Sequence, residues 1–170
     1  MTKHPPYRVM LSALTVLPLV TFAYGQQSSV DTTQARRTTV LFMCPHGAAK
    51  SLLASAYFQR AAKERGLNVR VEAAGIEPQA AVSTVVADHL ERNGYAVPVT
   101  KPRAVTKEDL NSADVVISMG CDLTGLPAAP RTLQTWDDVP GPSEDLKGAD
   151  EVIHRRVLAL VEELLARQQK

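Results

Sequence analysis

The eight residues CPHGAAKS, at positions 44–51, place a thiol, an amine and a hydroxyl between an apolar run and a helical pattern. A turn from a strand into a helix leaves the first helical amides unpaired and exposes the positive end of the helix dipole, which suits an anion. The same field favours the thiolate form of a cysteine. The pattern therefore makes Cys44 a candidate nucleophile beside a bound oxyanion, and an unreactive buried cysteine is the alternative.

Each part of this loop has an expected role. Inward-turned amides can surround a tetrahedral oxyanion without a metal, and Gly47 supplies the positive φ that such a curl requires. Lys50 would bring a positive charge to the anion, and Ser51 could hydrogen-bond the thiolate. His46 is either a further cation near the anion or a surface residue. The predicted oxyanion-binding residues are His46, Gly47, Ala48, Ala49, Lys50 and Ser51.

The elements that must position this loop follow from hydrophobic patterning. Short, continuously apolar runs predict strands that are covered on both faces, and apolar spacing of three and four predicts helices. Their alternation predicts an α/β fold: a single domain with a doubly wound sheet of about four parallel strands and helices on both faces. Ligands bind such sheets at the carboxyl ends of the strands, where Cys44 falls. Strands are expected over 38–44, 69–76, 115–119 and 131–136, and helices over 49–66, 81–94, 107–112 and 149–169.

The ends and the charge of the 170-residue chain limit the function classes. Residues 1–25 have a basic start, an apolar stretch and small residues before Gln26, which is typical of a secretory signal. The apolar run is shorter than the roughly 20 residues that span a bilayer, so an uncleaved anchor is the weaker alternative. Residues 26–37 are polar and predict a flexible linker before a domain at 38–168. We therefore expect a periplasmic or secreted protein that has no membrane contact after cleavage.

The net charge of +1, from 19 basic and 18 acidic residues, gives no support to a nucleic-acid or membrane-surface role. Both cysteines, Cys44 and Cys121, fall in the predicted domain. Two cysteines in an exported protein are compatible with a structural disulfide. A domain of this size does not need one, because its hydrophobic core is large enough to stabilise the fold. The sequence has no histidine cluster or CxxC pair at metal spacing, so we predict no metal and no cofactor.

Five segments of the predicted domain stand in a distinctive order: the 44–51 loop, EAAGIEP at 72–78, VVADHLERNGYAV at 85–97, KPRAVTKEDLNSADVVISMG at 101–120 and WDD at 136–138. Taken together, these motifs resemble the low-molecular-weight protein tyrosine phosphatases and the related thioredoxin-coupled arsenate reductases. The resemblance covers residues 38–168. It implies that Cys44 attacks phosphorus to form a thiophosphate intermediate, while a carboxylic acid from a later loop protonates the leaving oxygen.

Three departures from the family pattern qualify the expected activity. Lys50 stands where the family has Arg, so bidentate contact is lost and turnover should fall by more than phosphate affinity does. His46-Gly47 replaces Gly-Asn. The Asp-Pro pair that supplies the family's acid is missing from WDDVPGPSED at 136–145. Asp138 is our candidate acid, with the alternative that these carboxylates serve only as loop acids or helix caps. The other possible substitutes are Asp137, Glu144 and Asp145.

Three functions therefore remain open. The first is an exported phosphomonoesterase that works through Cys44, with phosphotyrosine among its candidate substrates. The second is an arsenate reductase-like enzyme in which Cys121 forms a disulfide with Cys44 and a thioredoxin-like partner reduces that disulfide. The alternative for Cys121 is a packed, unreactive thiol. The third is a binding module for phosphate or a phosphopeptide. The expected ligands are phosphate, arsenate or a phosphorylated substrate.

Overall fold

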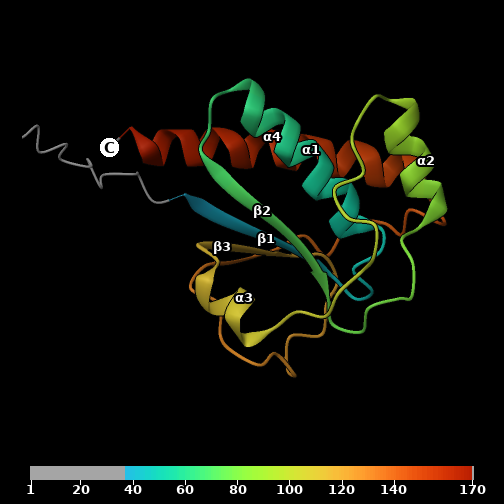
Figure 1. Ribbon diagram of the computed structural model, residues 1–170, viewed down its shortest axis with the longest axis horizontal. Helices are drawn as coiled ribbons and strands as arrows, with labels where there is room; N and C mark the ends of the chain where they lie inside the picture. The colour runs from blue at the N-terminus through green and yellow to red at the C-terminus, as the bar shows by residue number, and fades with distance from the viewer. Residues whose placement is uncertain (1–36, 170) are drawn as a thin grey trace, which may run out of the picture. The chain divides into compact units, whose positions relative to one another are not determined.

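A four-stranded, all-parallel sheet forms the centre of the computed structural model, which describes residues 37–169 (Figure 1). The strand order is β2-β1-β3-β4, which confirms the predicted parallel α/β fold. The predicted signal at 1–25 and nearly all of the predicted linker lie outside the described residues. The strands are β1 (Thr38–Cys44), β2 (Val69–Gly75), β3 (Val115–Ser118) and β4 (Leu133–Thr135).

Helices cover both faces of the sheet, as expected. Alternate residues of β1 point to opposite faces: Val40 and Phe42 belong to a core shared with α1, α2 and α4, whereas Leu41 and Met43 pack with Leu110 of α3. Figure 1 shows α1, α2 and α4 on one side of the sheet and α3 on the other. The helices are α1 (Lys50–Glu64), α2 (Thr84–Arg92), α3 (Lys107–Ser112) and α4 (Leu146–Gln168). No helix in the described part of the chain is both long and apolar enough to cross a bilayer.

Strand register places Cys44 at the edge of the sheet where ligands bind in this fold class. Cys44 is opposite Gly75 at the end of β2, and Met43 is opposite Ser118 at the end of β3. The carboxyl ends of three neighbouring strands therefore meet beside the loop that follows Cys44.

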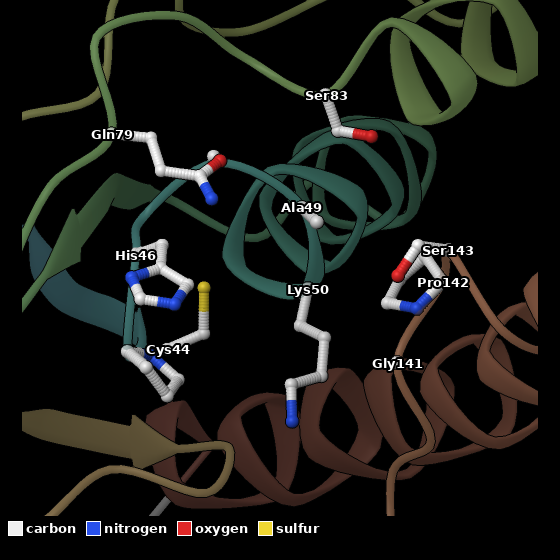
Figure 2. A pocket seen from close by; sticks show the side chains of 11 residues that line it. Cys44, His46, Ala49, Lys50, Gln79, Ser83, Gly141, Pro142 and Ser143 are labelled. Carbon is white, nitrogen blue, oxygen red and sulfur yellow. The ribbon is translucent and has the colours of Figure 1, made fainter.

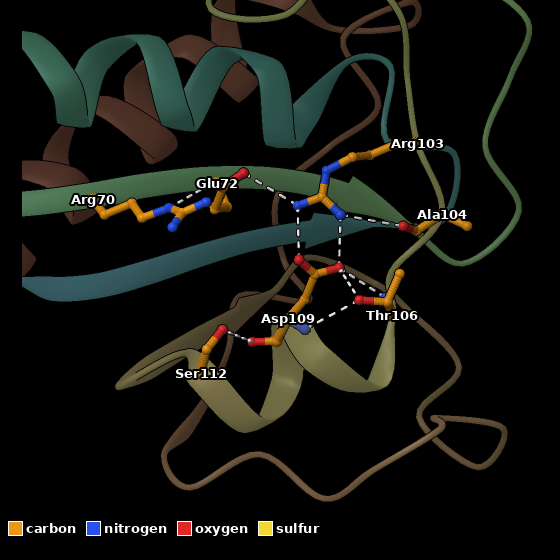
Figure 3. A network of polar contacts seen from close by, with 7 residues as sticks. All are labelled: Arg70, Glu72, Arg103, Ala104, Thr106, Asp109 and Ser112. Carbon is orange, nitrogen blue, oxygen red and sulfur yellow. Dashed lines mark hydrogen bonds and ion pairs between the residues drawn. The ribbon is translucent and has the colours of Figure 1, made fainter.

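A polar network fixes the segment that leads from α2 toward α3 (Figure 3). Arg103 donates to both carboxylate oxygens of Asp109, at 2.6 and 3.0 Å, and to Glu72 of β2 at 3.2 Å. Asp109 also closes the predicted capping box with Thr106 at the start of α3. Backbone bonds join Gly75 to this same segment: its amide donates to Arg103 O and its carbonyl accepts from the amide of residue 105. The end of β2 is thus held from one side by this network.

Helix α4 begins three residues earlier than the sequence pattern predicts. The side chain of Asp145 accepts a hydrogen bond from the amide of Gly148 at 2.8 Å and caps a helix that starts at Leu146. Asp150, which the pattern places near the start, therefore lies inside the helix, where its carboxylate accepts a hydrogen bond from the Tyr57 hydroxyl. That bond joins α1 to α4.

Candidate active site

The loop between β1 and α1 is curled by hydrogen bonds from outside. Three of its carbonyl groups accept bonds from amides of the segment that follows β2, so these carbonyls face away from the centre of the curl. Since carbonyl and amide of one peptide unit point in opposite directions, the amides of His46, Gly47 and Ala49 turn to the inner side, where that of Gly47 donates to Cys44 O at 3.3 Å. The bonds run from Glu77 to Pro45 at 2.9 Å, from Gln79 to His46 at 3.2 Å and from Ser83 to Ala48 at 2.9 Å.

Two glycines allow the loop to lie directly against the end of β2. Gly47 has φ +62°, and a Cβ built on it would lie 2.8 Å from Gly75 N. A Cβ on Gly75 would lie 2.5 Å from Gly47 N, so neither position has room for a side chain. The sequence predicts Gly47 but not Gly75, although an isolated glycine at a strand end is a known signal of close backbone approach.

The inner side of the loop carries unsatisfied donors. Among residues 37–169, the amides of His46, Ala48, Ala49, Lys50 and Ser51 find no hydrogen-bond acceptor. Helix α1 also starts without a side-chain cap at Ala49. Free amides beside the positive end of a helix dipole are an arrangement that suits an anion, so oxyanion binding at this loop stays a prediction.

The structure brings the predicted nucleophile to its predicted hydroxyl partner. The Sγ of Cys44 lies 3.2 Å from the Oγ of Ser51, and the two residues are 3% and 0% exposed. The contact allows either atom to donate, and Ser51 is the donor whenever Cys44 is a thiolate, which only accepts. The pair sits where β1 ends and α1 begins.

A cavity of about 260 Å³ opens over this loop (Figure 2). Its far walls come from the segment after β2 and from residues 141–143, which precede α4. No carboxylate and no Phe, Tyr or Trp side chain is among the lining residues. Within residues 37–169, no group of three or more His, Cys, Asp or Glu is placed to hold a metal ion. The lining residues are Cys44, Pro45, His46, Ala48, Ala49, Lys50, Gln79, Ser83, Gly141, Pro142 and Ser143.

Lys50 lines the cavity, but its amine is turned to a different partner. Its Nζ donates to Val139 O at 3.3 Å, and Figure 2 shows the side chain running away from the sulfur of Cys44. The loop thus places the amide of Lys50 at the start of α1, and its ammonium group at the segment between β4 and α4.

The structure does not bring the candidate acid Asp138 to the thiol. Asp138 is 63% exposed, pairs with Arg156 of α4 at 2.7 Å and does not line the cavity. The alternatives Asp137 and Asp145 are also engaged elsewhere, the first by accepting from Gly120 N at 3.1 Å and the second as the cap of α4. Glu144 is exposed beside Gly141, outside the lining set.

Cys121 follows β3 and is a half-buried free thiol, as Cys44 is a buried one. Burial raises the pKa of the Cys121 thiol, and a negative charge on Cys44 adds to this effect, while neighbouring hydrogen bonds and Lys50 oppose it. The two cysteines are thus close enough to influence each other. A raised pKa leaves Cys121 with less thiolate at neutral pH than an ordinary cysteine has.

Comparisons with known proteins agree with this geometry. A curated protein of Halobacterium salinarum, named "Putative arsenate reductase", is 29% identical over 127 residues, which cover 72% of this chain and 89% of that protein. The structure of a thioredoxin-dependent arsenate reductase of Corynebacterium glutamicum matches with a TM-score of 0.68 and 25% identity. That match covers 79% of this chain, and the chain spans only 65% of that structure.

The fold is also that of a low-molecular-weight phosphotyrosine phosphatase of Vibrio cholerae, with a TM-score of 0.67 at 22% identity over 76% of this chain and 98% of the other. The model of the family described as low molecular weight phosphotyrosine protein phosphatase matches residues 39–168. This match spans most of the chain and contains the loop, the cavity and both cysteines. The chain belongs to the low molecular weight phosphotyrosine protein phosphatase family.

Proposed function

We propose that this chain is a phosphomonoesterase that uses Cys44 as its nucleophile. The observation that carries the proposal is the 3.2 Å contact between Cys44 Sγ and Ser51 Oγ beside a loop that has free amides. A thiolate with a hydroxyl donor beside preorganised amides is the arrangement that attack on a bound phosphoryl group requires.

The reaction has two steps. In the first, the Cys44 thiolate attacks phosphorus, an S–P bond forms, and the P–O ester bond breaks with its electron pair on the alcohol oxygen, which takes a proton. In the second, water attacks phosphorus, gives up a proton, and the electron pair of the S–P bond returns to sulfur as inorganic phosphate leaves. The loop amides hold the equatorial oxygens in both steps, and Ser51 stabilises the thiolate as attacking and leaving group.

Lys50, where the family has Arg, should lower the rate of turnover more than the affinity for phosphate. The amides supply most of the donors to the anion, and these remain in place. Lys50 offers a point charge instead of a planar fork, and its amine now donates to Val139 O. We therefore expect phosphate to bind while turnover is slow.

Arsenate reduction is the second candidate, favoured by the relatives named as arsenate reductases and by the mutual influence of Cys44 and Cys121. Cys44 would displace a hydroxyl of arsenate, and Cys121 would then attack the sulfur of Cys44. The electron pair of the S–As bond would leave with arsenic as arsenite, so that two thiols are oxidised to a disulfide and As(V) is reduced to As(III). A dithiol protein of the thioredoxin kind would regenerate the thiols.

Export is a further part of the proposal. The signal-like pattern at residues 1–25 supports removal of that segment and function of the remaining chain in the periplasm or outside the cell. Fractionation of cells that express the full chain, followed by N-terminal sequencing of the product, tests it. A product that begins near Gln26 in the exported fraction is expected, and an intact Met1 in the cytosolic fraction would contradict it.

Hydrolysis of 4-nitrophenyl phosphate by the parent and by the Cys44→Ser and Cys121→Ser variants separates the candidates. Phosphatase chemistry predicts activity that is lost with Cys44→Ser and kept with Cys121→Ser. Arsenate-dependent disulfide formation that needs both thiols, seen by mass spectrometry, would favour the reductase. Phosphate-induced stabilisation without any turnover would instead indicate a binding module, because a ligand that binds only the native state raises its stability. Equal hydrolysis by parent and Cys44→Ser would refute the proposal.

A further inference from the structure

The cavity wall has no carboxylic acid, but it does have an imidazole. Three of the lining side chains are titratable: Cys44, which is the proposed nucleophile, Lys50, whose amine donates to a backbone carbonyl, and His46. An imidazole is the commonest acid or base in enzymes because it changes protonation near neutral pH. His46 is thus the one remaining group of the lining set suited to this work.

The contacts of His46 fix which of its nitrogen atoms is available. Nδ1 lies 3.2 Å from Glu77 O, and because a carbonyl oxygen can only accept, Nδ1 carries the hydrogen in that bond. Nε2 is left to exchange protons. The backbone of His46 is held by the same segment, since its carbonyl accepts from Gln79 N at 3.2 Å. The residue is therefore anchored twice while its ring stays exposed.

The position of His46 fits the place where a leaving group must depart. In-line attack by sulfur from the base of the loop puts the leaving oxygen on the opposite, solvent side of phosphorus. Cys44 is buried, whereas His46 is exposed and lines the same cavity. An exposed side chain of the cavity wall lies toward solvent, which is the side at which the leaving oxygen departs; Figure 2 labels both residues.

We propose that His46 Nε2 protonates the leaving oxygen and then accepts a proton from the attacking water. In the first step the imidazolium gives its Nε2 proton to the alcohol oxygen as the P–O bond breaks and the S–P bond forms. In the second, neutral Nε2 takes a proton from water as the new P–O bond forms and the S–P bond returns its electron pair to Cys44. His46 ends each cycle in its starting state. This inference rests on the proposed phosphomonoesterase activity.

The test compares substrates that differ in their need for an acid. 2,4-Dinitrophenolate leaves without a proton, whereas phenolate is much more basic. His46→Asn is the informative variant because its side-chain amide can keep the donor bond to Glu77 O but cannot shuttle a proton. We expect kcat/KM for phenyl phosphate to fall by about 100-fold or more, within the range of general acid catalysis. The value for 2,4-dinitrophenyl phosphate should change by less than about threefold.

Matched variants of the competing carboxylates make the result decisive. For Glu144→Gln and Asp138→Asn we expect any loss to be equal on both substrates, since neither carboxylate lines the cavity. An equal loss on both substrates for His46→Asn, or a loss confined to phenyl phosphate for Glu144→Gln or Asp138→Asn, would overturn the proposal. If the role of His46 is overturned, the proposed phosphomonoesterase function still stands provided that the parent hydrolyses 2,4-dinitrophenyl phosphate and Cys44→Ser does not. No hydrolysis by the parent would overturn both.

Discussion

Gly75→Ala should disable the anion-binding loop without changing any residue of that loop. Gly75 ends β2, and its φ is not positive, so alanine fits its backbone conformation. The added Cβ would lie 2.5 Å from Gly47 N and 2.6 Å from the carbonyl carbon of His46. Both are backbone atoms, so no side chain can rotate away to make room.

The size of the displacement follows from these distances. Ordinary contact begins at 3.4 Å, so the loop must retreat from β2 by about 0.9 Å. Hydrogen bonds from N–H to oxygen hold only between roughly 2.7 and 3.2 Å, so a shift of this size breaks at least one amide contact to a bound oxyanion. A hydrogen bond to a charged group contributes about 1.5–3 kcal/mol, which predicts at least a tenfold loss of phosphate affinity. Overpacking should lower the free energy of unfolding by about 1–3 kcal/mol.

Isothermal titration of phosphate and urea denaturation measure the two effects separately. Gly66→Ala is the matched control because Gly66 has φ +67° and a Cβ there would meet nothing within 4 Å. It should cost about 1 kcal/mol of stability from backbone strain alone and leave phosphate affinity unchanged. A Gly75→Ala protein that binds phosphate as tightly as the parent would refute the inferred approach of loop and strand.

Three further changes have defined outcomes. Lys50→Arg should raise kcat for aryl phosphates more than it raises phosphate affinity, because a planar fork can hold two oxygens; steady-state kinetics and titration compare the two. Asp109→Asn should cost about 1 kcal/mol in urea denaturation, a modest value because Arg103 is 38% exposed. Burial acts to raise the pKa of Asp109, but the bonds from Arg103 and Thr106 together outweigh it and lower that pKa, so the parent's extra stability should be present above about pH 4 and disappear in acid, whereas the variant lacks this dependence. Tyr57→Phe should cost about 1–2 kcal/mol by removing a hydroxyl that donates to Asp150. Burial and that bond raise the pKa of Tyr57, so the parent should lose this stability as pH rises above about 10, and the variant should not.

The fold could be predicted from the sequence because its signals are local. Apolar runs marked the strands, and the Thr106–Asp109 spacing marked the start of α3, where the structure has the capping box. The start of α4 was wrong because Asp145, a single capping side chain, outweighs the apolar periodicity on which the prediction rested. Element boundaries depend on such single contacts, whereas the presence of an element depends on many residues.

The candidate site also combines contacts between residues close in the sequence with contacts between distant segments. The contact between Cys44 and Ser51 joins two residues of one loop, so spacing and residue type were sufficient to suggest it. The close approach of Gly75 and the ion pair of Asp138 with Arg156 join segments that are distant in the sequence. Only the tertiary structure shows that Asp138 is held away from the cavity, or that Glu77 orients the ring of His46.

The most direct test of the account is to trap the phosphorylated enzyme. The parent is mixed with excess 2,4-dinitrophenyl phosphate, quenched in acid during turnover and digested for mass spectrometry. We predict one phosphoryl group on the peptide that contains Cys44, with none on the corresponding peptide of Cys44→Ser, which should not turn over the substrate. Turnover without a label on Cys44, or at an undiminished rate in Cys44→Ser, would contradict the central claim.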